Sequence, residues 1–167
     1  MNRSILFLGG ARSGKSRLAQ AEAERGADPL TFIATAQAFD DEMTERIARH
    51  QADRGPRWRT VEAPLALAPA IRAAAPGTVL VDCLTLWLSN LMLGDHDIDA
   101  ARAALVALVR HPPGRLILVS NEVGLGIVPE TPLGRAFRDE AGRLNQAVAA
   151  AAAEVRFVAA GLSIALK

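Results

Sequence analysis

The sequence predicts a three-layer α/β domain with a mainly parallel sheet, and two observations lead to this fold class. Short runs of consecutive apolar residues alternate along the chain with longer stretches of helical periodicity. Continuous apolar strands are typical of a parallel sheet that helices cover on both faces. The second observation is a strand, a glycine-rich turn and a helix in residues 4–25. The length of 167 residues suits one domain, so we expect a single domain over residues 1–167.

The first half of the chain predicts four strands and three helices. The strands are short apolar runs at 4–8, 31–33, 58–62 and 78–81. The helices are expected at 15–25, 40–52 and 64–75. Asp40 and Asp41 suit the start of the second helix, because aspartate caps a helix N-terminus well.

The second half predicts three helices and three strands. Helices are expected at 84–93 and 98–110, separated by the polar turn 94–97, and a third at 133–154. The alanine run 147–153 is interpreted as helix because it extends a helical pattern. Strands are expected at 115–120, 155–158 and 163–166, and a loop rich in Gly and Pro at 122–132.

Composition excludes several classes of protein. Half of the residues are hydrophobic and the formal net charge is +1, which excludes a disordered chain and gives no argument for nucleic acid. The single cysteine, Cys83, excludes an internal disulfide framework and a cysteine-based zinc site. No segment approaches the roughly 20 apolar residues that span a bilayer, and the apolar run 5–8 is too short for a signal-peptide core. We therefore expect a soluble, cytoplasmic protein.

The turn after the first strand carries the strongest motif. Gly-Gly-Ala-Arg-Ser-Gly-Lys-Ser matches the phosphate-loop pattern G-x-x-x-x-G-K-[ST] in full, between a strand and a helix. Glycines let successive N–H groups point at phosphate oxygens, and the helix adds its positive end. The motif predicts a P-loop NTPase-like (RecA-like) fold and a nucleotide site at Gly9, Gly10, Ala11, Arg12, Ser13, Gly14, Lys15 and Ser16.

Lysine is rare in this chain, which makes its position in the motif informative. Of nineteen cationic side chains seventeen are Arg, and the only lysines are Lys15 and Lys167. Lys15 is expected to reach the β- and γ-phosphates, where a compact charge on a flexible stem is preferred to Arg. Lys167 is the last residue and has no predicted role.

Asp82 follows the apolar strand 78–81, where an acidic residue commonly supports Mg²⁺ beside a phosphate loop. The hydroxyl of Ser16 is the expected second protein ligand of the metal. Because ligands bind outside the carboxyl ends of strands in open α/β sheets, Asp82, Gly9 and Asn121 are expected to converge. The alternative is that Asp82 only caps the helix that follows it.

The motif by itself does not choose between ATPase, GTPase and kinase. A regulatory GTPase usually carries Asn-Lys-x-Asp after a later strand to recognise guanine. Residues 120–123 read Ser-Asn-Glu-Val instead. A nucleotide-dependent switch protein is therefore a weaker alternative than an enzyme.

Four stretches together resemble one enzyme family. They are the phosphate loop, Ile-Ala-Thr-Ala at 33–36 with the acidic and basic segment 40–50, Asn-Glu-Val-Gly-Leu-Gly-Ile-Val-Pro-Glu at 121–130, and Phe-Arg-Asp-Glu-Ala-Gly-Arg-Leu-Asn-Gln at 137–146. With them the chain closely resembles the bifunctional adenosylcobinamide kinase/adenosylcobinamide-phosphate guanylyltransferase family of cobalamin biosynthesis, over essentially its whole length.

The resemblance implies two reactions. The first phosphorylates the aminopropanol hydroxyl of adenosylcobinamide with a nucleoside triphosphate, either GTP or ATP. The second transfers GMP from GTP to that phosphate through a guanylylated histidine, releasing pyrophosphate and giving adenosylcobinamide-GDP. The implied cofactors are GTP and Mg²⁺, and the implied partners are adenosylcobinamide and its phosphate, with no nucleic acid and no membrane span. The resemblance also implies a homo-oligomer, in the form of a ring-like trimer.

The resemblance places functional residues beyond the phosphate loop. The matching histidine is His50, and with Lys15 it forms the predicted catalytic pair. Further nucleotide contacts are implied at Ala34, Thr35, Ala36, Gln51, Ala52, Asp53, Arg54, Glu62, Asp82 and Leu84. Neutral imidazole is a competent nucleophile near pH 7, which agrees with the role of His50. Arg46, Arg49 and Arg54 are close to it in sequence and suit a triphosphate.

Several of these residues have plainer explanations from local sequence. A histidine on a polar helix is usually only solvated, and the arginines between 46 and 59 also suit a solvated face. Glu62 is equally consistent with a surface glutamate. The loop 122–130 suits either a lid or a rigid turn held by Pro129. The base of the kinase step is left between Asp82 and Glu122, and a kinase acting on another small alcohol is the main rival function.

Overall fold

The computed structural model describes residues 3–37 and 55–167, and all seven of its strands form one sheet. The strand order is β3-β2-β4-β5-β1-β6-β7. All neighbouring strands are parallel except β6 and β7, which are antiparallel. The strands are β1 (Ser4–Gly9), β2 (Leu30–Ala34), β3 (Trp58–Glu62), β4 (Thr78–Asp82), β5 (Arg115–Asn121), β6 (Glu154–Ala159) and β7 (Leu162–Ala165).

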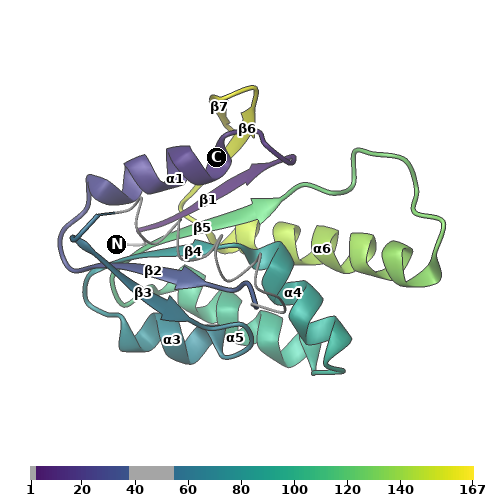
Figure 1. The fold of residues 1–167 in the computed structure, drawn as a ribbon, viewed down its shortest axis with the longest axis horizontal. Coiled ribbons are helices and arrows are strands. Elements are labelled where there is room, and N and C mark those ends of the chain that lie inside the picture. Colours follow the sequence, from purple (N-terminus) through teal and green to yellow (C-terminus); the bar gives the residue numbers. More distant parts are fainter. Residues whose placement is uncertain (1–2, 38–54) are drawn as a thin grey trace.

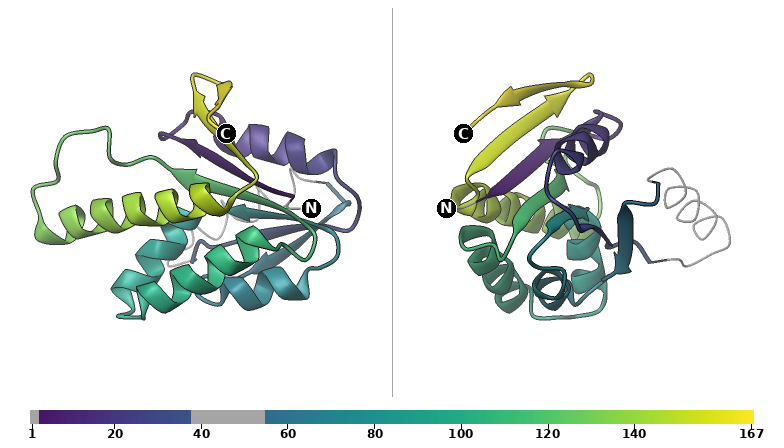
Figure 2. Two further views of the ribbon diagram at one scale, coloured as in Figure 1. Left: turned by 180° about the vertical axis from the view of Figure 1, so that it is seen from behind. Right: turned by 90° about the vertical axis from the view of Figure 1, so that its left-hand side faces the viewer.

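The described helices lie on both faces of this sheet. They are α1 (Lys15–Glu24), α3 (Leu67–Ala73), α4 (Leu84–Leu93), α5 (Ile98–Arg110) and α6 (Pro132–Ala151). Helix α1 covers one face, and α3, α4, α5 and α6 lie against the other (Figure 1; Figure 2, right). The predicted three-layer fold with a mainly parallel sheet is therefore confirmed.

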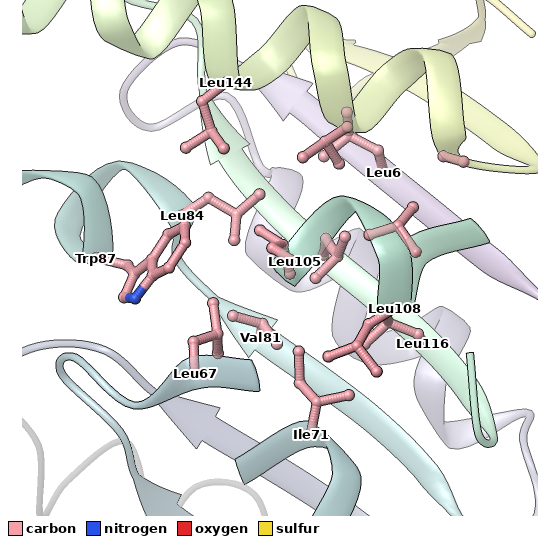
Figure 3. Close-up of a cluster of buried hydrophobic side chains, with 14 of the residues drawn as sticks. Leu6, Leu67, Ile71, Val81, Leu84, Trp87, Leu105, Leu108, Leu116 and Leu144 are labelled. Atoms are coloured by element: carbon pink, nitrogen blue, oxygen red, sulfur yellow. The ribbon is translucent and has the colours of Figure 1, made fainter. Parts of the chain in front are cut away.

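Each face of the sheet has its own apolar core. On the face of α3–α6, Leu6, Val81, Leu116 and their neighbours pack against helix residues such as Leu105 (Figure 3). On the other face, a smaller cluster joins Phe7, Ile117 and Val119 to Ala19 and Ala23 of α1. Alternate residues of one strand thus serve opposite cores, which explains why the strands are continuously apolar.

Replacing Leu105 by alanine is expected to lower the free energy of unfolding by about 2–5 kcal/mol, because Leu105 is fully buried and a cavity would remain. Leu166 is 61% exposed, so Leu166→Ala is the matched control and should change stability by less than about 0.5 kcal/mol. Urea unfolding monitored by circular dichroism measures both. Equal losses in the two variants would contradict this packing.

Two predicted helices are shorter in the structure. Helix α3 begins at Leu67 rather than residue 64, because the preceding carbonyls serve α4: Trp87 Nε1 donates to Leu65 O (2.9 Å) and Asn90 Nδ2 to Pro64 O (3.0 Å). Helix α6 ends at Ala151 rather than residue 154. Ala152 is extended, and the N–H of Ala153 donates to the carbonyl of Ser4 (3.1 Å), which takes the chain into the sheet.

The other predicted strands and helices are found where the structure describes them, within one or two residues at each end. The helix predicted at 40–52 lies outside the described residues. Within residues 3–37 and 55–167, no helix is both long and apolar enough to cross a bilayer.

Candidate nucleotide site

The carboxyl edge of the parallel strands brings the predicted site residues together. Gly9 at the end of β1 is paired with Asn121 at the end of β5, and Asp82 at the end of β4 is paired with Val119 on the same strand β5. Since neighbouring strands are about 4.8 Å apart, the ends of β1 and β4 are separated by about 10 Å. A polyphosphate with its metal ion is long enough to span this distance. The expected convergence of Gly9, Asp82 and Asn121 is thus seen in the structure.

The phosphate loop needs glycine at two positions for different reasons. Gly14, which precedes α1, has φ = 94°, a left-handed conformation that favours glycine. Gly9 has an ordinary backbone, but a Cβ there would lie 2.4 Å from the carbonyl oxygen of Val158 on β6. A side chain at either position would therefore displace the loop. A Cβ on Gly10, in contrast, would have no described neighbour within 4 Å, so packing does not explain this glycine.

The N-terminus of α1 provides the donors that an anion requires. Leu18 makes the first bond of the helix, from its N–H to the carbonyl of Gly14 (3.1 Å). The N–H groups of Lys15, Ser16 and Arg17 therefore have no acceptor within the helix. These groups and the helix dipole together favour a phosphate at this point.

Lys15 is held by the loop itself. Its side chain is buried, with the residue 8% exposed, and Nζ donates to the carbonyl of Gly10 at 2.9 Å. A buried ammonium group costs free energy unless it is paired, and a neutral carbonyl compensates its charge less well than an anion does. A triphosphate in the loop would offer this ammonium group a charged partner, as the sequence motif predicts.

The described residues suit Mg²⁺ held jointly by protein and phosphate. Ser16 is exposed, and Asp82 is half-buried at the end of β4. No group of three or more His, Cys, Asp or Glu side chains occurs in the described part of the chain. Mg²⁺ at nucleotide sites is commonly bound by one or two protein oxygens, with phosphate and water completing its octahedron. Ser16 and Asp82 match that pattern, whereas a site made only of protein ligands is absent among these residues.

A buried polar network lies behind this edge, and sequence reasoning missed it. Thr35 Oγ1 donates to Cys83 O (2.7 Å) and accepts from Cys83 N (2.9 Å), joining the ends of β2 and β4. Asn121 Nδ2 donates to Thr85 Oγ1 (2.7 Å), and Asn145 Nδ2 donates to Asn121 O (3.1 Å). The partners are 24 to 48 residues apart in sequence, so local spacing does not reveal them. The network fixes the loops that follow β2, β4 and β5.

The thiol of Cys83 belongs to this network, and burial raises its pKa above the ordinary value, with the neighbouring negative charge of Asp82 adding to the effect. The protonated form is therefore favoured in the folded state. The raised pKa of Cys83 therefore stabilises the folded protein fully at pH values below the pKa of the unfolded thiol, about 8.5. This stabilisation decreases as the pH rises above that value.

At pH 8 the folded protein is expected to react with Ellman's reagent at least about tenfold more slowly than a free thiol, because the buried sulfur is both inaccessible and protonated. The absorbance of released thionitrobenzoate measures the rate. The same protein in guanidinium chloride is the control, and it should release one equivalent at once, since Cys83 is the only cysteine. A rapid full equivalent from the folded protein would contradict this burial.

The residues assigned by resemblance lie in different settings. Ala34 and Thr35 are buried at the end of β2. The backbone of Thr35 is also hydrogen-bonded: its N–H donates to Asp82 O (3.4 Å), and its carbonyl accepts from Asn90 Nδ2 (2.8 Å). Ala36 is half-buried, and Glu62 is at the end of β3, paired with Ala34. Leu84 is fully buried in the core shown in Figure 3, so only its backbone at the start of α4 faces the edge of the sheet. His50, Gln51, Ala52, Asp53 and Arg54 lie outside the described residues.

The loop between β5 and α6 projects beyond the sheet (Figure 1). Two arginines of α6 form hydrogen bonds with its backbone. Arg138 Nη2 donates to Gly124 O (2.7 Å), and Arg135 Nη1 donates to the carbonyls of Pro129 (3.1 Å) and Glu130 (2.7 Å). At the base of the loop, Glu122 Oε1 accepts from the N–H of Gly124 (2.5 Å). These bonds favour the rigid turn over the lid.

A cavity of about 470 Å³ lies at the opposite, amino edge of the sheet. Arg3, Arg25 and Arg115 line it, and Arg25 and Arg115 both pair with the buried carboxylate of Glu22. Helices α1 and α5 end near this edge, where cationic side chains complement their dipoles. The phosphate loop lies at the other, carboxyl edge of the sheet, where the nucleotide is expected.

Comparison with solved structures agrees with the fold. The flagellar accessory protein FlaH from Methanocaldococcus jannaschii superposes with a TM-score of 0.56 at 14% identity, over 99% of this chain and 78% of FlaH. An ATPase of a bacterial type III secretion system superposes with a TM-score of 0.50 at 13% identity, over 99% of this chain and 57% of the ATPase. At such low identity these neighbours establish the P-loop NTPase-like fold alone.

Sequence comparison decides the family. The family model described as cobinamide kinase / cobinamide phosphate guanyltransferase matches residues 5–166. The chain belongs to this family. The match includes the phosphate loop and the segment 38–54, and it makes the chain an enzyme of a kinase and guanyltransferase family rather than a regulatory switch.

Relatives within the cobinamide kinase family are similar over their whole length. The bifunctional adenosylcobalamin biosynthesis protein CobP of Pseudomonas aeruginosa is 53% identical over 166 residues, covering 97% of this chain and 96% of CobP. The bifunctional adenosylcobalamin biosynthesis protein CobU of Escherichia coli is 43% identical over 180 residues, covering 98% of this chain and 99% of CobU. The resemblance found from the motifs is thereby confirmed.

Proposed function

We propose that this chain phosphorylates the aminopropanol hydroxyl of adenosylcobinamide and then transfers GMP from GTP to the phosphate it has made. The family match over residues 5–166, together with an intact phosphate loop, is the observation that carries this proposal. The products are adenosylcobinamide-GDP and pyrophosphate. GTP serves the second reaction, and either GTP or ATP serves the first.

The phosphate loop supports both reactions because each one moves a phosphoryl group of a nucleoside triphosphate. Free N–H groups at the start of α1 and the ammonium group of Lys15 are placed to stabilise negative charge as it develops on phosphate oxygens. Bound Mg²⁺ would supply further neutralisation of that charge, and Ser16 and Asp82 are its proposed protein ligands. Asp82 and Glu122, both at this edge of the sheet, are the candidates for accepting the proton of the attacking hydroxyl.

His50 is the proposed nucleophile of the guanylyl transfer. Its neutral imidazole nitrogen attacks the α-phosphorus of GTP, so a P–N bond forms, the bond to the bridging oxygen breaks, and pyrophosphate leaves. A phosphate oxygen of adenosylcobinamide phosphate then attacks the same phosphorus, and the P–N bond breaks to restore the imidazole. The remaining proposed nucleotide contacts are those of the resemblance, from Ala34 to Leu84.

The reaction sequence is tested with adenosylcobinamide and GTP that carries a label at the γ-phosphorus or at the α-phosphorus. With γ-labelled GTP the label should enter adenosylcobinamide phosphate, and with α-labelled GTP it should enter adenosylcobinamide-GDP; thin-layer chromatography separates the two. Substitution of cobinamide by a simple amino alcohol is the control and should give no labelled product. Transfer to the amino alcohol with no product from adenosylcobinamide would favour the rival kinase.

We also propose that the chain acts as one domain in a cytoplasmic homo-oligomer, with the trimer carried over from the resemblance. The apolar residues Leu125, Ile127 and Val128 are exposed at the projecting loop. The loop ends at Thr131, which lines a groove of about 340 Å³ together with Met92, Leu93, Leu133 and Phe137. An apolar projection next to an apolar groove suits burial against a second copy of the chain. Sedimentation velocity of the whole protein tests this, and a monomer at micromolar concentration would contradict it.

A further inference from the structure

The hairpin of β6 and β7 lies at the edge of the sheet, beside the strand that leads into the phosphate loop. Strand β6 is paired with β1, and β7 is paired only with β6 among the described strands (Figure 1; Figure 2, right). All four residues of β7 are exposed. Strand β7 therefore buries little apolar surface, whereas Val155 and Val158 of β6 are buried in the two cores. Core packing explains β6 but does not explain β7 or the turn that joins them.

The turn of this hairpin contacts the phosphate loop directly. The N–H of Gly161 donates to the carbonyl of Ser13 at 2.8 Å. The two backbones are so close that a Cβ on Gly14 would lie 3.2 Å from Gly161 Cα. At the start of the loop, a Cβ on Gly9 would lie 2.4 Å from the carbonyl oxygen of Val158 on β6. The loop is thus held against the hairpin at both ends.

The bond from Gly161 fixes the orientation of one peptide group in the loop. The Ser13–Gly14 peptide is trans and planar, so its C=O and N–H point in opposite directions. Because the C=O points at the hairpin, the N–H of Gly14 points away from it. No acceptor for that N–H occurs among the described residues. This is the arrangement that a phosphate held by the loop requires.

The conformation of the turn explains why glycine stands at 161. Ala159 and Leu162 are paired, so the hairpin loop has two residues, and both have positive φ: 51° at Ala160 and 78° at Gly161. This matches a type I′ turn, which favours Gly at its second position. A β-branched side chain at 161 is strained at this φ and would move the N–H away from Ser13.

We propose that Gly161 is a positioning residue for the phosphate loop: its N–H holds the Ser13 carbonyl and thereby presets the N–H of Gly14 for the β-phosphate of the nucleotide. This inference rests on the proposed use of the loop for GTP. It assigns a role in nucleotide binding to a hairpin turn that is about 145 residues from the motif in sequence.

The test is equilibrium binding of GTP, GDP and GMP to the whole protein carrying Gly161→Val, by competition with a fluorescent GTP analogue. GTP and GDP are expected to bind about tenfold more weakly, since one charge-assisted hydrogen bond is lost. GMP, which has no β-phosphate, should be unchanged. Ala160→Gly is the matched control, because glycine accepts the same turn, and its affinities should stay within about twofold of the parent.

Thermal unfolding without nucleotide distinguishes this role from a general loss of structure. If Gly161→Val does not fold, Gly161→Ala replaces it, with the same direction expected. A folded variant that binds GTP as tightly as the parent overturns the positioning role. A variant whose affinity for GMP falls as much as its affinity for GTP overturns it as well. Failure of the unsubstituted protein to bind GTP or ATP would instead overturn the proposed function.

Discussion

Lys15→Ala is expected to reduce both the kinase and the guanylyltransferase rates by at least about 100-fold, because each transition state loses its nearest cation. In the free protein Nζ is bound to the carbonyl of Gly10, within the phosphate loop. The bound nucleotide is expected to replace this neutral acceptor by phosphate oxygens, so the side chain should contribute mainly when the triphosphate is bound. Steady-state assays with γ- and α-labelled GTP measure the two rates separately.

Two variants make the experiment sharper. Lys15→Arg keeps the charge but replaces a compact ammonium group by a planar guanidinium, and it should recover little activity. Lys167→Ala is the matched control, because Lys167 is the only other lysine. Its Nζ donates to the carbonyls of Ala149, Ala150 and Ala152 at the end of α6, a capping role that the sequence did not predict. Lys167→Ala should cost about 0.3–1 kcal/mol of stability and leave both rates unchanged. Full kinase activity in Lys15→Ala would remove the phosphate loop from the mechanism.

His50→Ala is expected to abolish covalent labelling by α-labelled GTP. It should lower the guanylyl transfer rate by at least about 10⁴-fold, because loss of an enzyme's nucleophile can cost on the order of 10⁶ in kcat. Phosphorylation of adenosylcobinamide should continue, since that step needs no bond to imidazole. Labelled protein is measured after gel electrophoresis. The label on the parent protein should be lost in acid and stable in base, as a phosphoramidate is.

The remaining histidines provide the controls. His96 follows α4, and His111 ends α5; neither has an assigned role in the reaction. His96→Ala and His111→Ala should both keep the label. Persistent labelling of His50→Ala would refute the nucleophile assignment, and an acid-stable label would indicate another linkage.

The same labelling experiment separates the proposed enzyme from its rivals. A kinase for another alcohol would give no covalent GMP adduct with any variant. A nucleotide-dependent switch would bind GTP and hydrolyse it at most, without a response to adenosylcobinamide. Membership in the cobinamide kinase family favours a labelled protein that passes its GMP to the cobinamide phosphate.

Features with a local physical cause could be predicted from the sequence. Strand β3 and helices α4 and α5 have the predicted boundaries, because apolar periodicity and turn residues lie within the segment itself. Asp97 is an example: its side chain accepts the N–H of Ala100 and caps α5. The phosphate loop is equally local, since eight consecutive residues specify its glycines, its lysine and its helix.

Other features depend on partners far away in the chain, and only the tertiary structure decided them. The alanine run 147–153 contains no signal for a helix end, yet α6 stops at Ala151 because Ala153 pairs with Ser4 at the start of β1. The hydroxyl of Thr35, a residue expected to contact nucleotide, joins β2 to Cys83 after β4. The hydrogen bond from the N–H of Gly161 to the carbonyl of Ser13 likewise joins residues that are far apart in the chain. Helical periodicity and caps are properties of neighbouring residues, whereas these hydrogen bonds exist only once the sheet has brought residues 48 to 149 positions apart into contact.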